Sequence, residues 1–242
     1  MFSVEKLIYP LWKEADISPD GFREVLVEQL GRELSQSGDI HGVRVTVADS
    51  AVADAAGRRM ESHTPVPDAV LSLWVDSAEA AAAWEPMVDK CVSRKTAYLV
   101  VEAEPLVSQR QYPSAPGDRV YGMCHVVFFR KPAGLDREQW LDIWKGSHTR
   151  VAIDTQSTFG YRQNVVVRAL GEGTPPCDAI VEENFPPEAM TSDHAFYDAV
   201  GDDALLEQRM TAMMESCARF IDFEQIDVIP MSEYVVKPLG RH

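Results

Sequence analysis

The chain has 242 residues, 45% of them hydrophobic and 25% charged, so it can bury one large core or two cores in domains of about 100–150 residues. Its 38 acidic and 23 basic residues give a net charge of −15, which argues against nucleic acid and anionic membrane surfaces as partners. From its first residues we expect no signal peptide. No apolar run approaches the roughly 20 residues that cross a bilayer, so we expect a soluble, cytoplasmic protein.

The first half of the chain alternates strand and helix patterns. Its strand patterns lie at residues 5–12, 43–47, 69–75 and 97–101. After the first strand, Ser18 and Pro19 make a helix start, and apolar residues then recur at three- and four-residue spacing from Phe22 to Leu34. The alanine-rich stretch 77–92 predicts the second helix. The order of elements is therefore β-α-β-β-α-β.

The second half repeats this order. Its strand patterns lie at residues 124–129, 161–168, 179–185 and 226–229. A long helix opens at 135–138, and 191–218 is predicted to be helical with a break near Gly201.

The two halves keep a nearly constant offset, which indicates an internal repeat. Trp140 follows Phe22 by 118 residues, and Gly160 follows Gly42 by the same number. The offset falls to 110 at the third strand, so the connection before that strand is eight residues longer in the first half.

This pattern predicts an α+β fold of two tandem ferredoxin-like halves. A βαββαβ unit places two helices on one face of a four-stranded sheet. Two such units can cover each other's open faces and form an intramolecular dimeric α+β barrel. We expect a degenerate N-terminal half at 1–110, a Pro- and Gly-rich linker at 111–120 and a C-terminal half at 121–242 that carries the site.

The first helix of the second half carries the sharpest chemical signal. Trp140, Trp144 and His148 lie four residues apart and so form one stripe. At the offset of 118, His148 takes the place of Leu30, so an imidazole replaces an apolar residue. A buried imidazole needs a hydrogen bond, and its pKa suits it to moving protons. A satisfied core histidine is the alternative, and core packing is the alternative for both tryptophans.

Three segments together resemble the EthD family of dimeric α+β barrel proteins. They are FFRKPAGL at 128–135, the stripe that ends at His148, and GYRQN at 160–164. The segment 195–199 and Arg219-Phe220 also resemble that family's second helix. The resemblance covers residues 121–236, and the first half looks like a degenerate copy.

The resemblance implies a pocket between the helices and the outer face of the sheet, with His148 as the acid–base residue. The family includes dehydratase-, decarboxylase- and cyclase-like tailoring enzymes that act on aromatic or polyketide-like molecules. They use neither metal nor organic cofactor, so no cofactor is expected here. The family also includes accessory proteins of catabolic clusters.

Tyr161 is the expected catalytic partner of His148, because its hydroxyl can bind an oxygen where negative charge develops. A half-buried structural tyrosine is the alternative. Strand alternation places Gln163 on the face of Tyr161 and Asn164 on the opposite face, unless a bulge intervenes. The candidate substrate-binding residues are Trp140, Trp144, Gln163, Asn164, Phe185, Phe196 and Tyr197.

The sequence gives little support for a disulfide, a metal centre or a paired-carboxylate site. The cysteines Cys91, Cys124, Cys177 and Cys217 contain no CxxC pair, so we expect neither a disulfide nor a metal centre. His125 shares the alternation of Val127 and Phe129 and is expected to face the core between the halves. Glu182 and Glu183 are sequence neighbours and should point to opposite faces of a strand, which argues against a paired-carboxylate site.

We therefore expect a cofactor-independent EthD-like enzyme. It would use acid–base catalysis for a lyase-type reaction (dehydration, decarboxylation or cyclisation) on a small hydrophobic, aromatic or polyketide-like substrate. Two alternatives stay open: a non-catalytic binding or accessory protein of a catabolic or biosynthetic cluster, and a cofactor-free monooxygenase. The expected partner is the small molecule, with a homo-oligomer left open.

Overall fold

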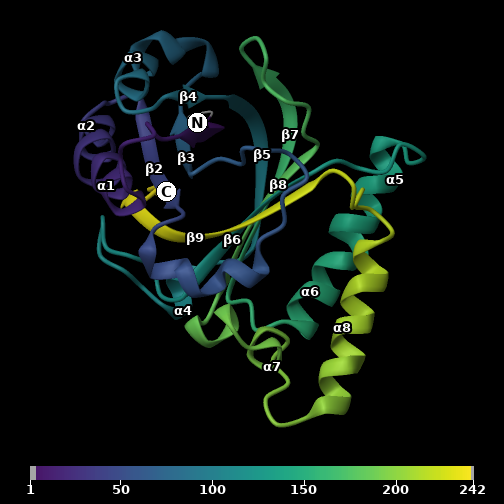
Figure 1. Ribbon diagram of the computed structural model, residues 1–242. Coiled ribbons are helices and arrows are strands. Elements are labelled where there is room, and N and C mark those ends of the chain that lie inside the picture. Colours follow the sequence, from purple (N-terminus) through teal and green to yellow (C-terminus); the bar gives the residue numbers. More distant parts are fainter. Residues whose placement is uncertain (1–3, 241–242) are drawn as a thin grey trace.

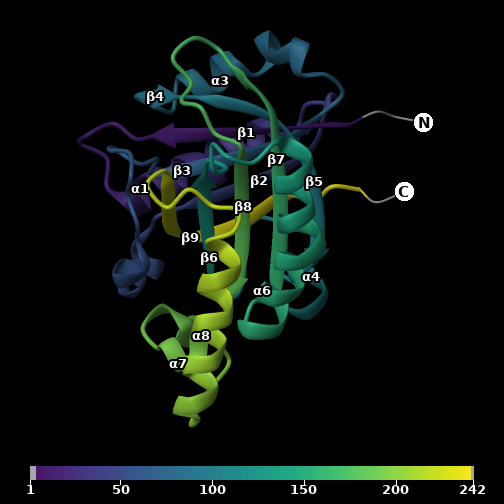
Figure 2. The ribbon, with the colours of Figure 1, turned by 90° about the vertical axis from the view of Figure 1, so that its right-hand side faces the viewer.

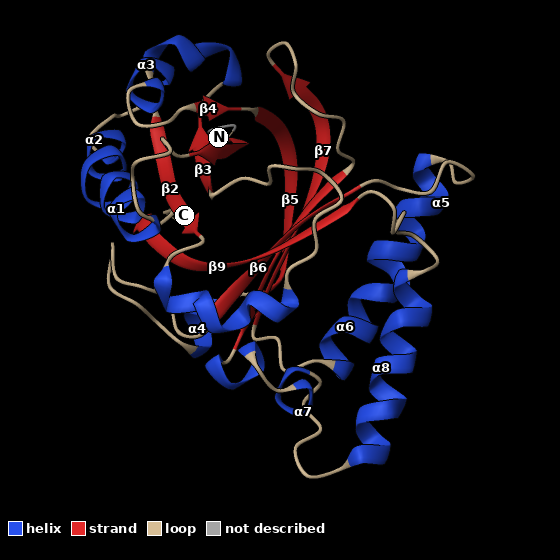
Figure 3. Ribbon diagram, in the orientation of Figure 1, coloured by secondary structure: helices blue, strands red, loops and turns tan. Residues whose placement is uncertain are grey.

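The structure is a computed structural model that describes residues 4–240, and its centre is a closed antiparallel barrel (Figures 1 and 3). The barrel strands are β1 (Glu5–Trp12), β2 (Ile40–Val47), β3 (Ala69–Val75), β5 (Ala97–Leu106), β6 (Met123–Phe129), β7 (Gly160–Leu170), β8 (Ala179–Phe185) and β9 (Ile226–Lys237). They pair in the order β3-β2-β9-β6-β8-β7-β5-β1, and β1 pairs again with β3 to close the ring. The short strand β4 (Arg94–Lys95) adds to β1. An α+β fold with a barrel-like antiparallel sheet is therefore confirmed.

Each half contributes four consecutive strands of the ring. The first half supplies the order β5-β1-β3-β2 and the second half supplies β9-β6-β8-β7. Antiparallel pairing of β2 with β9 and of β5 with β7 joins them at two seams.

The first helix of each half contains a π-helical segment. In the first half, α1 (Pro19–Glu24), η1 (Val25–Leu30) and α2 (Gly31–Ser35) form one helix that Ser18 caps. In the second half the helix consists of α5 (Arg137–Leu141), η4 (Asp142–His148) and α6 (Thr149–Thr155). Leu30 and His148 are the last residues of the two π-helical segments, as the offset of 118 predicts.

The remaining helices are short, apart from α8. They are η2 (Ser50–Arg58), η3 (Ala78–Ala83), α3 (Glu85–Asp89), α4 (Ser108–Gln111), η5 (Pro187–Met190), α7 (Asp193–Phe196) and α8 (Asp203–Cys217). The prediction of one helix at 77–92 is wrong. Trp84 leaves the helical conformation because Pro86, which has no N–H to donate, opens a new short helix. The predicted break near Gly201 is confirmed, since that glycine has φ 81° between α7 and α8.

The barrel interior has an apolar layer and a charged layer. The apolar layer includes Ile8, Val126 and Ile180. In the charged layer, Arg162 is fully buried and its Nη2 lies 2.9 Å from Glu233 Oε2. Outside the barrel, α6 and α8 lie side by side against β6, β7 and β8 (Figure 2). The outer face of the second half is thus covered by helices, and the candidate site lies beneath them.

Candidate active site

His148 is held between the two long helices of the second half. Its Nδ1 lies 2.9 Å from Ser216 Oγ on α8, and its ring packs 4.5 Å from the ring of Phe220. The side chain is 4% exposed, and burial lowers the pKa of the imidazole to about 4. The imidazole is therefore neutral near pH 7. With Nδ1 occupied by Ser216, Nε2 is the atom left for exchanging a proton.

Trp140 and Trp144 lie in the core beneath this helix. Both indoles are fully buried, and their Nε1 atoms donate to Phe220 O and Tyr161 Oη at 3.1 and 3.2 Å. Phe129 packs edge-on against both rings. The structure therefore places the two tryptophans in the packing that supports the site.

Tyr161 and Gln163 share one face of β7, as predicted. Gln163 Nε2 donates to Tyr161 Oη at 3.1 Å and to Thr149 Oγ1 at 2.8 Å. Tyr161 Oη also accepts the N–H group of Trp144, so two donors orient the phenol. The hydroxyl proton of Tyr161 itself remains available to donate. Burial, reinforced by the nearby charge of Glu183, raises the pKa of Tyr161 well above its usual range, so the hydroxyl stays protonated.

Asn164 is separated from these residues, on the opposite face of β7. Its Nδ2 donates to Ile180 O at 2.9 Å, and its Oδ1 accepts from Lys6 Nζ at 2.9 Å inside the barrel. The structure therefore separates Asn164 from Tyr161 and Gln163.

Glu183, which the sequence did not single out as a site residue, lies at the centre of the face beneath the helices. The strand register pairs it with Tyr161 on β7 and with His125 on β6, so the three side chains form one row across the sheet. The side chain is 9% exposed, and no residue that the structure describes forms a hydrogen bond or ion pair with it. Burial raises the pKa of this carboxyl to about 7. A carboxyl with that pKa can take up and release a proton under physiological conditions.

His125 points towards the helices, so the expectation that it faces the core between the halves is wrong. Val127 and Phe129, which share its face, pack into the cluster beneath the helices and not inside the barrel. Burial, and to a lesser degree the charge of Arg58, lowers the pKa of His125 to about 3. Its Nε2 is buried and has no hydrogen-bond partner among the described residues. A buried polar atom without a partner is costly unless a ligand satisfies it.

Aromatic residues after β8 close one end of the row. Phe185 stacks on Phe196 with ring centres 4.3 Å apart, and Tyr197 packs edge-on at 5.1 Å from Phe196. The rings of Phe185 and Phe196 lie 5.2 and 5.5 Å from that of His125. These three predicted residues are thus brought together beside the row.

The longer connection of the first half also reaches this site. Arg58, at the end of η2, lies 4.5 Å over the ring of Phe196. Its Nε donates to Ala189 O and its Nη1 pairs with Asp193, both at 2.7 Å. The connection between β2 and β3 therefore holds the segment after β8 that closes one end of the row.

Strand alternation in the sequence could have identified Glu183 and His125 as candidate site residues. Glu183 shares its face of β8 with Ala179, Val181 and Phe185, so it is the one acid on an apolar face. His125 occupies the same kind of position on β6. A single titratable residue on an apolar strand face is therefore the pattern that would have found both.

Residues 4–240 show neither a metal site nor a membrane-spanning helix. They contain no group of three or more His, Cys, Asp or Glu side chains placed to hold a metal ion. No helix in this range has the length and apolar character needed to cross a membrane. The four cysteines are free thiols.

The closed antiparallel ring with helices on its outer faces defines this chain as an α+β barrel protein. It is similar to the crystal structure of an anthrone oxidase-like protein, with a TM-score of 0.57 and 11% identity over 99% of this chain and 96% of that one. A putative chlorite dismutase has a TM-score of 0.48 and 12% identity, covering 96% and 94%. A chlorite dismutase from Candidatus Nitrospira defluvii has a TM-score of 0.47 and 11% identity, covering 98% and 92%.

At these identities the likeness shows the fold alone. No protein-family model and no curated protein matches the sequence. The barrel that the EthD resemblance implies is confirmed, whereas membership of the EthD family itself is not shown.

Proposed function

We propose that this protein is an EthD-like acid–base enzyme that moves a proton on a small hydrophobic, aromatic or polyketide-like substrate. The reaction is of the lyase type: dehydration, decarboxylation or cyclisation. The observation that carries the proposal is the position of Glu183, a buried carboxyl between His125 and Tyr161 with no hydrogen-bond or ion-pair partner among residues 4–240. In this proposal the substrate reaches the row on the face of the sheet that α6 and α8 cover.

In this mechanism Glu183 is the general base. Its carboxylate takes a proton from a carbon next to a carbonyl group. The C–H electron pair forms a C=C bond, and the C=O π pair moves to the oxygen, which gives an enolate. Tyr161 donates its hydroxyl proton in a hydrogen bond to that oxygen. Loss of a β-hydroxyl group as water, with a proton returned from the enzyme, completes a dehydration.

His148 is the second proton-transfer group in this proposal. Its neutral imidazole offers Nε2, while the bond to Ser216 fixes the ring. Trp144 and Gln163 orient Tyr161 through the two N–H groups that its oxygen accepts.

The proposal assigns the site to the second of two tandem ferredoxin-like halves, joined through residues 111–120. The matching strand orders of the two halves support this division. The two π-helical segments, which end 118 residues apart, support it independently because π segments are rare.

A cofactor-free oxygenase is the second candidate. The similar structure described as anthrone oxidase-like favours it. The first step is the same proton abstraction, after which the carbanion transfers electrons to dioxygen. A CH2 group and O2 then become a ketone and water, which balances atoms and electrons.

Proton exchange in D2O tests the step that both candidates share. We would incubate the protein, under anaerobic conditions, with anthrone, β-keto acids and β-hydroxy ketones and follow deuterium uptake by mass spectrometry. The Glu183→Gln variant should lose at least about a hundredfold of the exchange rate, the range for loss of a general base. His148→Ala should slow turnover, and the matched control Glu188→Gln, an exposed acid nearby, should retain the full rate.

The products then distinguish the candidates. Loss of water or CO2 identifies the lyase, and oxygen consumption after readmission of air identifies the oxygenase. Exchange at the original rate in Glu183→Gln would rule out the assigned base. Ligand binding without exchange would favour a binding protein in place of an enzyme.

A further inference from the structure

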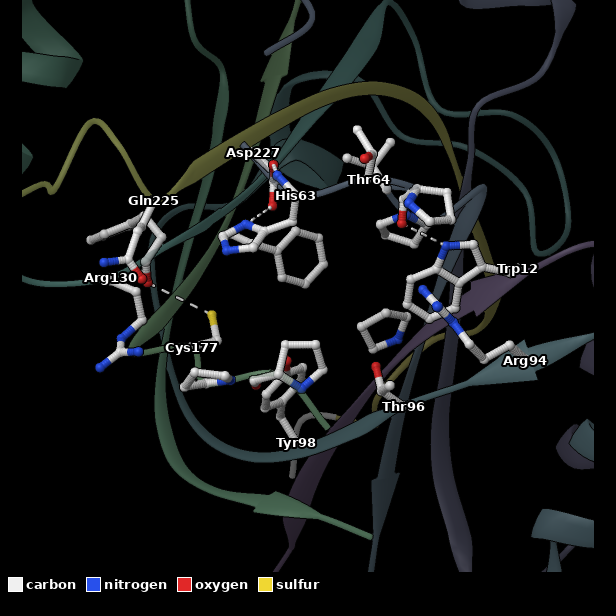
Figure 4. Close-up of a pocket in the computed structure, with 18 residues that line it drawn as sticks. Trp12, His63, Thr64, Arg94, Thr96, Tyr98, Arg130, Cys177, Gln225 and Asp227 are labelled. Carbon is white, nitrogen blue, oxygen red and sulfur yellow. Dashed lines mark hydrogen bonds and ion pairs between the residues drawn. The ribbon is translucent and has the colours of Figure 1, made fainter. Parts of the chain in front are cut away.

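A cavity lies at one end of the barrel and is separate from the row of His125, Glu183 and Tyr161 (Figure 4). Its volume is about 280 Å³. None of the three residues of the row lines it. Ligand cavities run from about 300 to 1,000 Å³, so this one suits a molecule of one or two rings.

The walls of this cavity are flat and apolar. They include the aromatic residues Trp12, Tyr98 and Phe128, together with proline rings from two loops. One loop precedes β3 in the first half, and the other precedes β8 in the second half. Planar rings bind well against such walls.

Barrel side chains hold both loops in place. Trp12 Nε1 donates to Pro65 O at 3.0 Å, and Tyr98 Oη donates to Pro175 O at 2.7 Å. The cavity is therefore preformed, which lowers the entropic cost of binding a ligand.

The acidic groups beside the cavity are already satisfied. Asp227 Oδ1 accepts the backbone N–H groups of Ser62 and His63, and its Oδ2 lies 3.0 Å from His63 Nδ1. Asp178 is 2.7 Å from Arg130 Nε.

Arg94, in contrast, carries a free positive charge. Its guanidinium lies 3.5 Å over the ring of Trp12, and no acid among the described residues pairs with it. Beside it, the Thr96 hydroxyl points into the cavity (Figure 4) and is buried without a hydrogen-bond partner among those residues. A cation and an unused hydroxyl on one side of an apolar cavity form a receptor for a carboxylate.

We propose that this cavity is a second ligand site, specific for a small planar carboxylate of one or two rings. The ring lies among Trp12, Tyr98 and Phe128, and the carboxylate accepts hydrogen bonds from Arg94 and Thr96. The proposal does not depend on the reaction at Glu183.

The test compares 2-naphthoate with its uncharged counterpart, 2-naphthamide, by isothermal titration calorimetry. The parent protein should bind the naphthoate at least about tenfold more tightly, because only the carboxylate pairs with Arg94. Arg94 is exposed, so Arg94→Gln should fold and should bind both probes equally. Thr96→Val should weaken naphthoate binding by a smaller factor.

Glu183→Gln separates this site from the proposed active site and should leave naphthoate binding unchanged. Equal affinity of the parent protein for both probes would overturn the proposal. So would loss of naphthoate binding in Glu183→Gln with retention in Arg94→Gln. Absence of binding at millimolar naphthoate would overturn it as well.

Discussion

Two neighbouring glutamates show how side-chain surroundings decide chemistry in this barrel. Burial alone would raise the pKa of Glu182, but the cations Lys6 and Arg162 outweigh it and hold that pKa far below its usual range. Glu183 faces the other way, meets no cation among the described residues, and has its pKa raised to about 7 by the same burial. The contrast arises from the two-residue period of the strand, which separates a structural carboxylate from a titrating one.

The raised pKa of Glu183 predicts a pH-dependent cost to stability. Between its usual pKa of 4.5 and about 7, the folded state keeps a proton that the unfolded state releases. The free energy of unfolding therefore falls as pH rises through this window, by about 3 kcal/mol in total. The Glu183→Gln variant has no titrating carboxyl at this position, so its free energy of unfolding should lack this decrease.

Urea unfolding of both proteins from about pH 4 to 8 measures this difference. Glu183→Gln should gain about 3 kcal/mol relative to the parent protein as pH rises, and the gain should level off above pH 7. A stability difference that stays constant across the range would show that Glu183 titrates normally.

At the scale of elements, sequence patterns located the apolar strands well. The predicted strands 69–75 and 179–185 are confirmed at both ends. The strands predicted at 97–101 and 226–229 in fact continue to Leu106 and Lys237. Both extensions contain a proline and charged side chains, which interrupt the apolar strand pattern.

Tertiary structure explains why those extensions were missed. Glu102 and Glu233 project into the barrel, where Lys6 and Arg162 pair with them. Such partners lie far away in sequence, so no local pattern reveals them. The face of β7 that carries Gln163 follows from alternation within one strand, so it could be predicted. The row through Glu183 depends on how three strands pair, which a local pattern does not reveal.

The start of β6 depends on a glycine. Gly122 has φ 74°, and a Cβ added there would lie 1.9 Å from the carbonyl oxygen of Phe185. We expect Gly122→Ala to lower the free energy of unfolding by at least about 3 kcal/mol, because strain and a backbone collision add.

Gly171→Ala is the matched control for this prediction. Gly171 has a similar φ of 79° with nothing within 4 Å of the added Cβ, so its loss should be about 1–2 kcal/mol. Chemical denaturation measures both variants. Equal losses would mean that the backbone at Gly122 moves aside without cost.

At the scale of the whole molecule, the barrel makes the two halves mutually dependent. The seams β2–β9 and β5–β7 join them, and the apolar layer inside the barrel contains residues of both, such as Ile8 and Ile180. Neither half could close a ring alone, and each would expose strand edges.

Cleavage of the connecting segment tests this dependence. A protease site inserted between Ser114 and Ala115, near exposed residues, should allow a cut that leaves the two fragments together on native size exclusion. As the urea concentration rises, the cut protein should unfold and its two fragments should separate in one cooperative transition. Fragments that separate under native conditions would show that the halves fold independently.

The central claim is that Glu183 titrates near neutral pH within the row of His125 and Tyr161. The most direct measurement is carbon-13 NMR of the glutamate side-chain carboxyl carbons across a pH titration, with Glu183→Gln to assign the signal. The structure predicts one resonance with a midpoint of about pH 7 that disappears in the variant. A midpoint for Glu183 near its usual 4.5 would contradict the assignment of this carboxyl as the general base.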